Sequence, residues 1–419
     1  MREPTLPDSC AAPENPSVLR VNAAREAILA KLPVLQSRQK LALRDTLGRV
    51  LAEDLISPFN VPPYANSAMD GYALASTDLE KLPATLRCVG QAFAGQPFAG
   101  SVQPGECIRI MTGAIVPDGC DTVIMQELAE VNGESIQFSG EHRHGDNVRL
   151  AGEDISQGQT VFSKGRRINA ADLGLLASLG FGEISVLRQL RVAFFSTGDE
   201  LKSIGESLKP GDIYDSNRYT LYAMLQKLGI DMLDMGVIKD DPEALRQALQ
   251  TASDNADVVI TSGGVSVGDA DYIKALLAEL GQVNFWKIAM KPGRPLAFGQ
   301  IGNTPFFGLP GNPVSVMVTF YQFVLPALQK MAGETQTAPL LLQATAAAPI
   351  RKRPGRFEFQ RGILKSSADG QLQVCMTGEQ GSGILSSMSH ANCFILLDEN
   401  CAGITAGETV TVQPFAGLM

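Results

Sequence analysis

A glycine-rich turn between a predicted strand and a predicted helix constrains the fold of this chain of 419 residues more than any other feature. The apolar run DVVI at 257–260 is typical of a buried strand, and residues 272–280 have the apolar spacing of an amphipathic helix. Gly263, Gly264 and Gly268 lie between them and allow the backbone to turn sharply and to approach a ligand closely. Because such a turn presents N–H groups and the positive end of a helix, it predicts a site for phosphate or another anion.

Two carboxylates, Asp269 and Asp271, follow this turn. An Asp before a helix most often caps it, and we expect this role for Asp269. We expect Asp271 to take part in chemistry, because an acid beside an anion site is favourable when a divalent cation bridges the two. Further along, Asp241 is predicted to cap a helix that Pro242 opens, and Asn312 to cap a long apolar helix that Pro313 opens. Residues 41–55 are predicted to form a strand followed by a helix.

Strands and helices alternate over residues 189–333, which predicts an α/β domain with a mainly parallel sheet and helices on both faces. Ligands bind beyond the carboxyl ends of the strands in sheets of this kind. Four turns should therefore meet at one edge of the sheet. They are STGDEL (196–201), TSGGVSVGD (261–269), AMKPGRP (289–295) and LPGNPVS (309–315).

The rest of the chain divides into segments of different character. Residues 1–16 contain four prolines and no periodicity, so we expect them to be disordered. Short strands separated by Gly and Pro turns predict a small β domain over 58–149, and helical character before and after it predicts a discontinuous helical domain made of 17–57 and 150–188. Short strands at roughly ten-residue spacing over 334–419 predict a C-terminal β-barrel. The expected fold class is a multidomain α/β and β protein.

Composition excludes several function classes. The net charge of -9 argues against nucleic acid as a partner. Seven scattered cysteines without a CxxC pair predict reduced thiols instead of disulfides or a zinc site, and three histidines are too few to favour a His-based metal site. No targeting segment or apolar run long enough to span a membrane is present, so we expect a cytoplasmic protein without a membrane partner.

Six phrases together resemble one family, the molybdopterin molybdenumtransferases or MoeA family, to which the gephyrin E-domain also belongs. They are NSAMDGYA (66–73), AGEDI (151–155), STGDEL (196–201), SGGVSVGDADY (262–272), MKPGRPLAFG (290–299) and GLPGNPVS (308–315). The resemblance runs from about residue 17 to the C-terminus. It implies a four-domain plan with a central domain like those of MogA and MoaB.

The resemblance also implies a reaction. Family members insert molybdenum from molybdate into the dithiolene of adenylyl-molybdopterin, with magnesium, and release AMP and molybdenum cofactor. The implied partners are these small molecules, a second copy of the chain in a homodimer, and molybdopterin adenylyltransferase.

The resemblance implies a role for individual residues. The positions expected to act in catalysis are Asp70, Asp154, Glu200, Asp240, Asp271, Lys287 and Lys291. Magnesium is expected at Asp271 and Glu200, and molybdate at Lys291, Arg294, Arg361 and Ser382. The pterin nucleotide is expected at Arg149, Ser262, Gly263, Gly264, Ser266, Gly268, Pro310, Gly311, Asn312 and Pro313.

The sequence departs from the family at two of these places, and two other functions stay open. Arg294 stands where the family usually has Lys, and Leu150 and Ala151 replace a commonly basic pair beside Arg149. Asp240 also fits an ordinary helix start. The alternative functions are a molybdopterin adenylyltransferase, whose single domain resembles residues 191–333, and a non-catalytic scaffold like the related domain of gephyrin.

Overall fold

The computed structural model describes residues 18–264 and 271–415, which by their contacts form two compact units. The ranges are 18–40, 46–50 and 185–415 for the large unit, and 41–45 and 51–184 for the small unit. The segment 1–16, predicted to be disordered, lies outside the described residues. None of the described helices is both long enough and apolar enough to cross a membrane.

A seven-stranded sheet forms the centre of the large unit, in the order β1-β19-β21-β22-β18-β14-β17. Its strands are β1 (Val18–Leu19), β14 (Arg191–Thr197), β17 (Asp231–Ile238), β18 (Val258–Ser262), β19 (Gly281–Ile288), β21 (Pro295–Ile301) and β22 (Thr304–Leu309). β21 is antiparallel to both of its neighbours, and all other neighbouring strands of this sheet are parallel. The sheet is thus mainly parallel, as the sequence predicts for the α/β domain.

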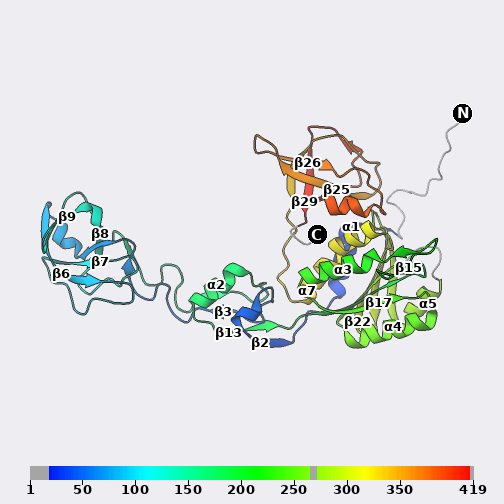
Figure 1. Cartoon of the computed structure of the whole chain (residues 1–419), viewed down its shortest axis with the longest axis horizontal. Coiled ribbons are helices and arrows are strands. Elements are labelled where there is room, and N and C mark those ends of the chain that lie inside the picture. The colour runs from blue at the N-terminus through cyan, green and yellow to red at the C-terminus, as the bar shows by residue number, and fades with distance from the viewer. Residues whose placement is uncertain (1–17, 265–270, 416–419) are drawn as a thin grey trace. The chain divides into compact units, whose positions relative to one another are not determined.

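Helices cover both faces of this sheet (Figure 1). One face packs against α1 (Val21–Lys31), α3 (Ser216–Lys227), α6 (Pro313–Thr319) and α7 (Leu325–Met331), and the other against α4 (Pro242–Asn255) and α5 (Asp271–Leu280). Successive side chains of a strand point to opposite faces, so Phe194 of β14 lies in the first layer and Phe195 in the second. Residues Phe320–Val324 join α6 to α7 as a π-helical turn.

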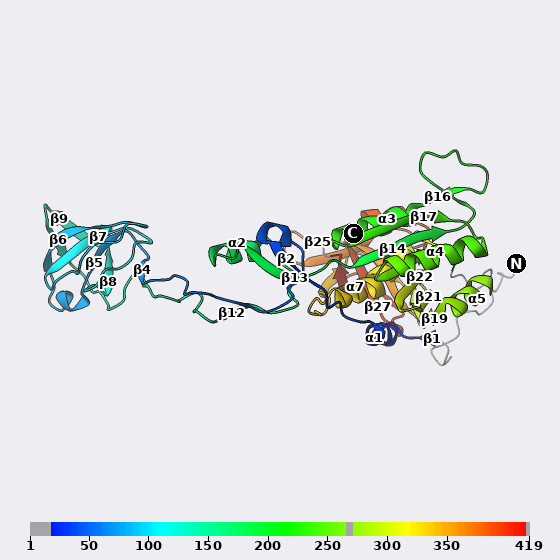
Figure 2. The same cartoon turned by 90° about the horizontal axis from the view of Figure 1, so that it is seen from below.

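The first described residues belong to this α/β layer (Figure 2). β1 pairs with β19, and the apolar face of α1, with Val21, Ala24 and Ile28, packs against α7 and the sheet. This differs from the range 17–57 predicted for the discontinuous helical domain. The apolar spacing of α1 is the same for any partner, so the sequence could not specify which layer the helix covers.

A closed barrel of five strands completes the large unit, as predicted for the C-terminal region. Its strands are β23 (Leu342–Ala346), β25 (Phe357–Ser366), β26 (Leu372–Met376), β27 (Cys393–Leu397) and β29 (Thr409–Pro414), and β25 pairs with both β26 and β27 to close the ring. β20 (Met290–Lys291) extends the barrel by pairing in parallel with β25. The turn after β19 therefore joins a strand of the barrel, and α8 (Leu385–His390) also contacts β25.

The small unit contains a six-stranded sheet in the order β8-β5-β7-β6-β10-β9. Its strands are β5 (Gly71–Leu74), β6 (Ala84–Ala92), β7 (Glu106–Ile110), β8 (Thr122–Met125), β9 (Ala129–Asn132) and β10 (Ser135–Phe138). Helix α2 (Ala170–Ser178) starts with a complete capping box formed by Asn169 and Asp172. Short pairs of strands complete the unit, among them β4 (Asn66–Ser67) with β11 (Val148–Arg149) and β3 (Leu55–Ile56) with β12 (Thr160–Phe162).

Candidate functional site

One edge of the large sheet gathers the turns that the sequence singled out. β14, β17, β18, β19 and β22 run in the same direction, so their carboxyl ends lie at the same edge. The turns that follow these strands carry the predicted site residues Glu200, Asp240, Gly263, Lys291 and Gly311. The strand order arranges them as basic residues after β19, glycine turns after β22 and β18, and acids after β14 and β17.

Gly263 lies at the centre of this edge and is required by geometry. Its φ is +90°, and a Cβ atom there would lie 2.4 Å from the carbonyl oxygen of Thr197. Its N–H donates to the carbonyl oxygen of Leu309 at 3.2 Å. Three strand ends therefore meet at a position that only glycine fills without strain. Gly264, with φ +69°, continues the turn.

Asn217, which the sequence did not single out, ties two of these turns together. Its Nδ2 donates to the hydroxyl of Ser262 at 2.8 Å and to the carbonyl oxygen of Gly311 at 2.7 Å. Asn217 is 8% exposed, and its Oδ1 is buried without a hydrogen-bond partner in the structure. The hydroxyl of Ser262 thus faces α3, although the sequence predicts it as a ligand of the pterin nucleotide.

The start of α3 carries a second buried contact to the sheet. Asp215 caps the helix by accepting a hydrogen bond from the N–H of Arg218, and it also accepts one from the hydroxyl of Ser196 at 3.0 Å. An Asp before an apolar helical pattern is a recognisable cap signal, so Asp215 could have been found from the sequence. Asn217 carries no such signal, because its partners are brought to it by the sheet.

The acidic end of the edge contains Asp199, Glu200 and Asp240. The N–H of Asp240 donates to Oδ1 of Asp199 at 3.3 Å. Burial and the neighbouring carboxylates of Asp199 and Glu200 raise the pKa of Asp240 above its usual range. The carboxylate of Glu200 folds back over Gly198, where a Cβ would lie 2.7 Å from one of its oxygens.

Magnesium prefers carboxylate oxygens, so the donor chemistry of this end fits the ion. The arrangement fits it only in part. Among the residues that the structure describes, no group of three His, Cys, Asp or Glu side chains is placed to hold one metal ion. Oxygens from a bound phosphate would be needed, together with Glu200, to hold the ion.

The basic end follows β19. Lys287 is exposed at the end of this strand, and Arg294 is partly exposed in the turn that leads to β21. The side chain of Lys291, on β20, is 49% exposed, and its Nζ lies 3.6 Å from Oε1 of Glu358 in the barrel. The N–H of Ile288 donates to the carbonyl oxygen of Arg294 and closes the turn.

The barrel contributes a buried cation. Arg361 is 1% exposed; its Nε donates to the hydroxyl of Ser387 at 3.0 Å and its Nη2 to the carbonyl oxygen of Gly381 at 3.0 Å. Burial lowers the pKa of Arg361 to about 10. Because its guanidinium is covered, a direct contact with molybdate as predicted requires the residues around Gly381 to uncover it. Ser387 was missed by sequence reasoning, since it lies 26 residues away from Arg361.

The side chain of Asn312 contacts Ser382 instead of capping α6, which corrects the predicted capping role. Asn312 occupies the N-cap position of α6 and Pro313 opens the helix, but the side chain of Asn312 makes no capping hydrogen bond. Its Nδ2 donates to the hydroxyl of Ser382 at 3.2 Å instead, and the N–H of Val314 donates to the carbonyl oxygen of Ser382. The contact holds the Pro310–Gly311 turn against the barrel. The predicted capping role was wrong because this barrel loop competes for the amide.

The predicted residues of the small unit are exposed. The backbone N–H and the hydroxyl of Thr112 donate to Oδ1 of Asp70 at 2.8 and 2.7 Å and hold its pKa below the usual range. Arg149 lies on β11, opposite Asn66 of β4. The N–H of Asp154 donates to the carbonyl oxygen of Val61.

Part of the predicted glycine turn lies outside the described residues. This applies to Ser266 and Gly268 as ligands and to Asp269 as a cap. Asp271 is the first residue of α5, which confirms the predicted helix after the turn.

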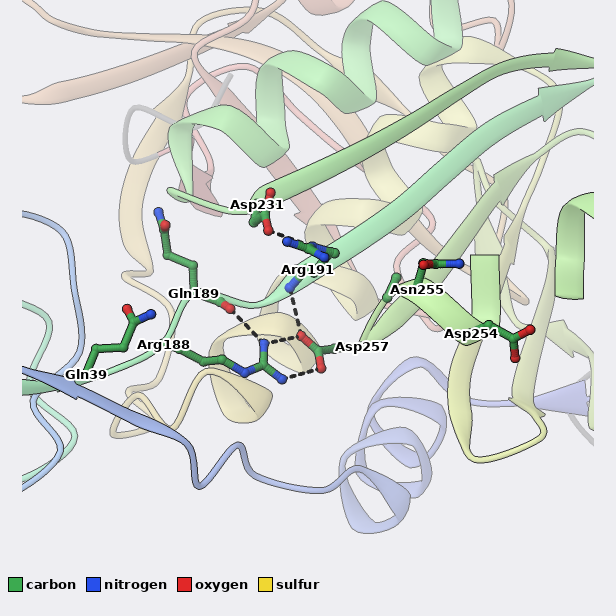
Figure 3. A pocket seen from close by; sticks show the side chains of 9 residues that line it. Gln39, Arg188, Gln189, Arg191, Asp231, Asp254, Asn255 and Asp257 are labelled. Atoms are coloured by element: carbon green, nitrogen blue, oxygen red, sulfur yellow. Dashed lines mark hydrogen bonds and ion pairs between the residues drawn. The ribbon is translucent and has the colours of Figure 1, made fainter. Parts of the chain in front are cut away.

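A polar cavity of about 460 Å³ lies at the opposite edge of the sheet, at the start of β14, β17 and β18 (Figure 3). Both arginines that line the cavity form ion pairs with aspartates. Both terminal nitrogens of Arg188 donate to Asp257 at 2.7 Å, and Nε of Arg191 donates to Asp231 at 2.6 Å. Because these cations are neutralised, the cavity offers no uncompensated positive charge to an anionic substrate.

Comparison with known proteins agrees with this arrangement. The profile "MoeA N-terminal region (domain I and II)" matches residues 19–180, "Probable molybdopterin binding domain" matches 193–330, and "MoeA C-terminal region (domain IV)" matches 343–415. A curated molybdopterin molybdenumtransferase of Haemophilus influenzae is 45% identical over 404 residues, which cover 96% of this chain and 100% of the relative. One from a Nostoc species is 35% identical, over 91% of this chain and 90% of the relative.

A solved structure supports the same conclusion. The crystal structure of the molybdopterin biosynthesis moeA protein from Pyrococcus horikoshii superimposes with a TM-score of 0.84 at 29% identity, covering 95% of this chain and 100% of that one. Sequence and fold agree over nearly the whole length, and this chain belongs to the MoeA family of molybdopterin molybdenumtransferases.

Proposed function

We propose that this protein is a molybdopterin molybdenumtransferase, which inserts molybdenum from molybdate into the dithiolene of adenylyl-molybdopterin and releases AMP. Curated relatives with this name, 45% and 35% identical to the chain over most of its length, support the proposal. The site described above gives it a physical basis.

The observation that carries the proposal is the order of charge along the carboxyl edge of the sheet. Basic residues lie after β19, glycine turns after β22 and β18, and acids after β14 and β17. An extended substrate with an anionic end, a phosphate bridge and a nucleotide needs several different environments in a row. The glycine at position 263 lets a phosphate approach the backbone closely in the middle of that row.

We assign the oxyanion to the basic end. Lys291 and Arg294 reach solvent and offer charged donors, which bind an oxyanion more strongly than neutral donors do. Arg361, three residues beyond Glu358 on β25, adds positive potential from the barrel. The hydrogen bonds that its side chain donates all go to neutral groups, so its charge is not compensated within the described structure. Ser382 completes the proposed set of four, and Lys287 is proposed to act in catalysis.

We assign magnesium to the acidic end. When bound, the ion would neutralise negative charge that develops on the phosphates as the bond to AMP breaks. Glu200 and Asp271 are its proposed ligands. Asp240 is proposed to assist them, because burial and the repulsion from Asp199 and Glu200 disfavour its ionisation. A bound cation would relieve this repulsion. Asp70, Asp154 and Arg149 of the small unit are proposed to act in the same reaction.

We also propose a homodimer that works in the cytoplasm and receives its substrate from a molybdopterin adenylyltransferase. The support is chemical, since adenylyl-molybdopterin is an activated anhydride and its direct transfer between two enzymes limits loss to water.

The function is tested with purified protein, adenylyl-molybdopterin, molybdate and magnesium. We expect AMP and molybdenum cofactor to form together, and Glu200→Gln to lose most of this turnover while keeping its thermal unfolding temperature. Formation of adenylyl-molybdopterin from ATP and molybdopterin would favour the adenylyltransferase alternative. Absence of both reactions would leave a binding protein and overturn the proposal.

A further inference from the structure

Lys291 is distinctive among the four residues proposed to hold molybdate, because within the described structure it alone has a carboxylate partner. Glu358, on β25, lies directly opposite Lys291 in the register of β20 and β25. The distance from Nζ of Lys291 to Oε1 of Glu358 is 3.6 Å. The site that should receive an anion therefore already contains one.

Glu358 is held in place and Lys291 is not. Glu358 is 6% exposed, and its Oε2 accepts a hydrogen bond from Nε2 of Gln360 at 2.9 Å. Nε2 of Gln360 also donates to the carbonyl oxygen of Arg351 at 3.0 Å, which fixes the amide on the inner face of the barrel. The side chain of Lys291 is half exposed on a flexible stem. The carboxylate is thus the fixed partner, and the lysine is the one that can turn towards a ligand.

The ion pair between Lys291 and Glu358 is weak enough for a bound anion to replace the carboxylate. Buried carboxylates need a cationic partner, and Lys291 is the only ion-pair partner of Glu358 in the part of the chain that the structure describes. A single contact of 3.6 Å to a half-exposed lysine is a weak ion pair. An incoming oxyanion with several oxygens can therefore displace the carboxylate from Lys291.

We propose that Glu358 determines the affinity of the oxyanion site by competing with the bound anion for Lys291. This inference rests on the proposed role of Lys291 in binding the oxyanion. With the competitor present, the site holds a doubly charged anion only moderately, so that the anion is released into the reaction instead of being trapped. Glu358 is accordingly a positioning residue that does not itself touch the reacting atoms.

The test is equilibrium binding of molybdate alone, by calorimetry, to four proteins: wild type, Glu358→Gln, Lys291→Met and the double variant. Glutamine keeps an oxygen that can accept the hydrogen bond from Gln360, so the fold should be preserved. We expect Glu358→Gln to bind molybdate about tenfold more tightly, because Lys291 then has no carboxylate partner that the anion must displace. In the Lys291→Met background the same change should have little effect, because there is no lysine left to compete for.

A matched control is Glu279→Gln, which removes the same charge from a bidentate pair with Arg246. Glu279 lies in α5, just before the other end of β19, and its replacement should leave molybdate affinity unchanged. A measurement on the wild-type protein needs no substitution. Saturating molybdate should protect Lys291 from an amine-reactive reagent, as read by mass spectrometry of the modified peptide.

Equal or weaker binding by Glu358→Gln, a gain that persists without Lys291, or absence of protection of Lys291 would overturn the inference. Release of AMP by the wild-type protein tests the proposed function separately. AMP release without an affinity change refutes only the role of Glu358. An affinity change without AMP release refutes the proposed function and leaves the competition at Lys291 in place.

Discussion

At the scale of single residues, Gly263 is the position where sequence and geometry agree most directly. A Cβ there would lie 2.4 Å from the carbonyl oxygen of Thr197, and the φ of +90° disfavours any side chain. We expect Gly263→Ala to lower the free energy of unfolding by about 2 kcal/mol, through strain and displacement of the turn, and to abolish most AMP release. Denaturant unfolding and turnover measure the two effects.

Gly302 provides the control for this substitution. It also has a positive φ, of +56°, but a Cβ there would meet no atom within 4 Å. Gly302→Ala should therefore show a smaller loss of stability and unchanged turnover, because Gly302 lies in the turn between β21 and β22 at the far edge of the sheet. Equal losses of activity in the two variants would contradict the special role of Gly263.

Asn217 is a positioning residue at the same edge. Asn217→Ala removes hydrogen bonds to Ser262 and Gly311 that join the turns after β18 and β22. We expect a loss of about 1–3 kcal/mol in stability, since buried groups are left unpaired, and a larger rise in KM for adenylyl-molybdopterin than fall in kcat. Steady-state kinetics measure the changes in KM and kcat separately.

Asn255→Ala is the matched control, because this exposed amide donates only to the carbonyl oxygen of Thr251 within α4. It should change neither KM nor kcat. A fall in kcat for Asn217→Ala with KM unchanged would show that the turns are positioned without Asn217.

At the scale of elements, a charge cluster joins the starts of β14 and β18. Asp257 accepts hydrogen bonds from Arg188 and from the N–H of Arg191. Burial opposes ionisation of Asp257, but these bonds outweigh it and hold its pKa below the usual range. Above the usual Asp value of about 3.9 the carboxylate is charged in both states and the pair stabilises fully; the contribution is lost as pH falls through the lowered native value.

We therefore expect Asp257→Asn to be about 1–2 kcal/mol less stable than wild type at neutral pH, with the difference shrinking as the pH falls below the usual Asp value of about 3.9 and through the lowered native value. Urea unfolding across this pH range measures it. Asp254→Asn, in the same cavity but without an ion pair in the described part of the chain, should show no such pH-dependent difference. A constant difference at all pH values would mean that the Asp257 pair does not contribute through its charge.

Elements with strong local signals were predicted correctly. Asp241 caps α4 and Pro242 opens it, and the apolar residues Leu276 and Leu277 are buried as the helical spacing of α5 requires. Residues 41–55 were predicted as a strand followed by a helix, but no α-helix forms there: the segment contains the end of β2 (Arg38–Ala42), a 3-10 turn at Leu43–Thr46 and the first residue of β3. That prediction was wrong because the apolar residues Val50, Leu51 and Ala52 are buried by tertiary contacts and not by a helical face.

At the scale of the whole molecule, the proposed residues are divided between two units. Asp70 belongs to the small unit and Glu200 to the large one. We propose, following the family resemblance, a dimer in which both chains contribute to each site. Mixing the inactive variants Asp70→Ala and Glu200→Ala should then restore activity to about a quarter of wild type, because random exchange makes about half the dimers mixed and each of these has one intact site.

Mixing Asp70→Ala with Arg149→Ala is the control, since both changes lie in the small unit and no site would be free of a lesion. Subunit exchange is verified by mass-tagged chains. Verified exchange without recovery in the first mixture would show that each site is built from one chain.

The sequence alone determined the elements and the turn chemistry, because caps, apolar periods and positive-φ glycines are properties of a few neighbouring residues. It specified the strand DVVI, the turn at Gly263 and Gly264, and the helix that begins at Asp271. Only the tertiary structure decided the partners across long separations. Asn312 forms a hydrogen bond with Ser382, and the loop at Gly381 covers Arg361. Glu358 forms an ion pair with Lys291 because the barrel packs against the turn after β19. Such contacts depend on which surfaces meet after folding, and no local pattern encodes them.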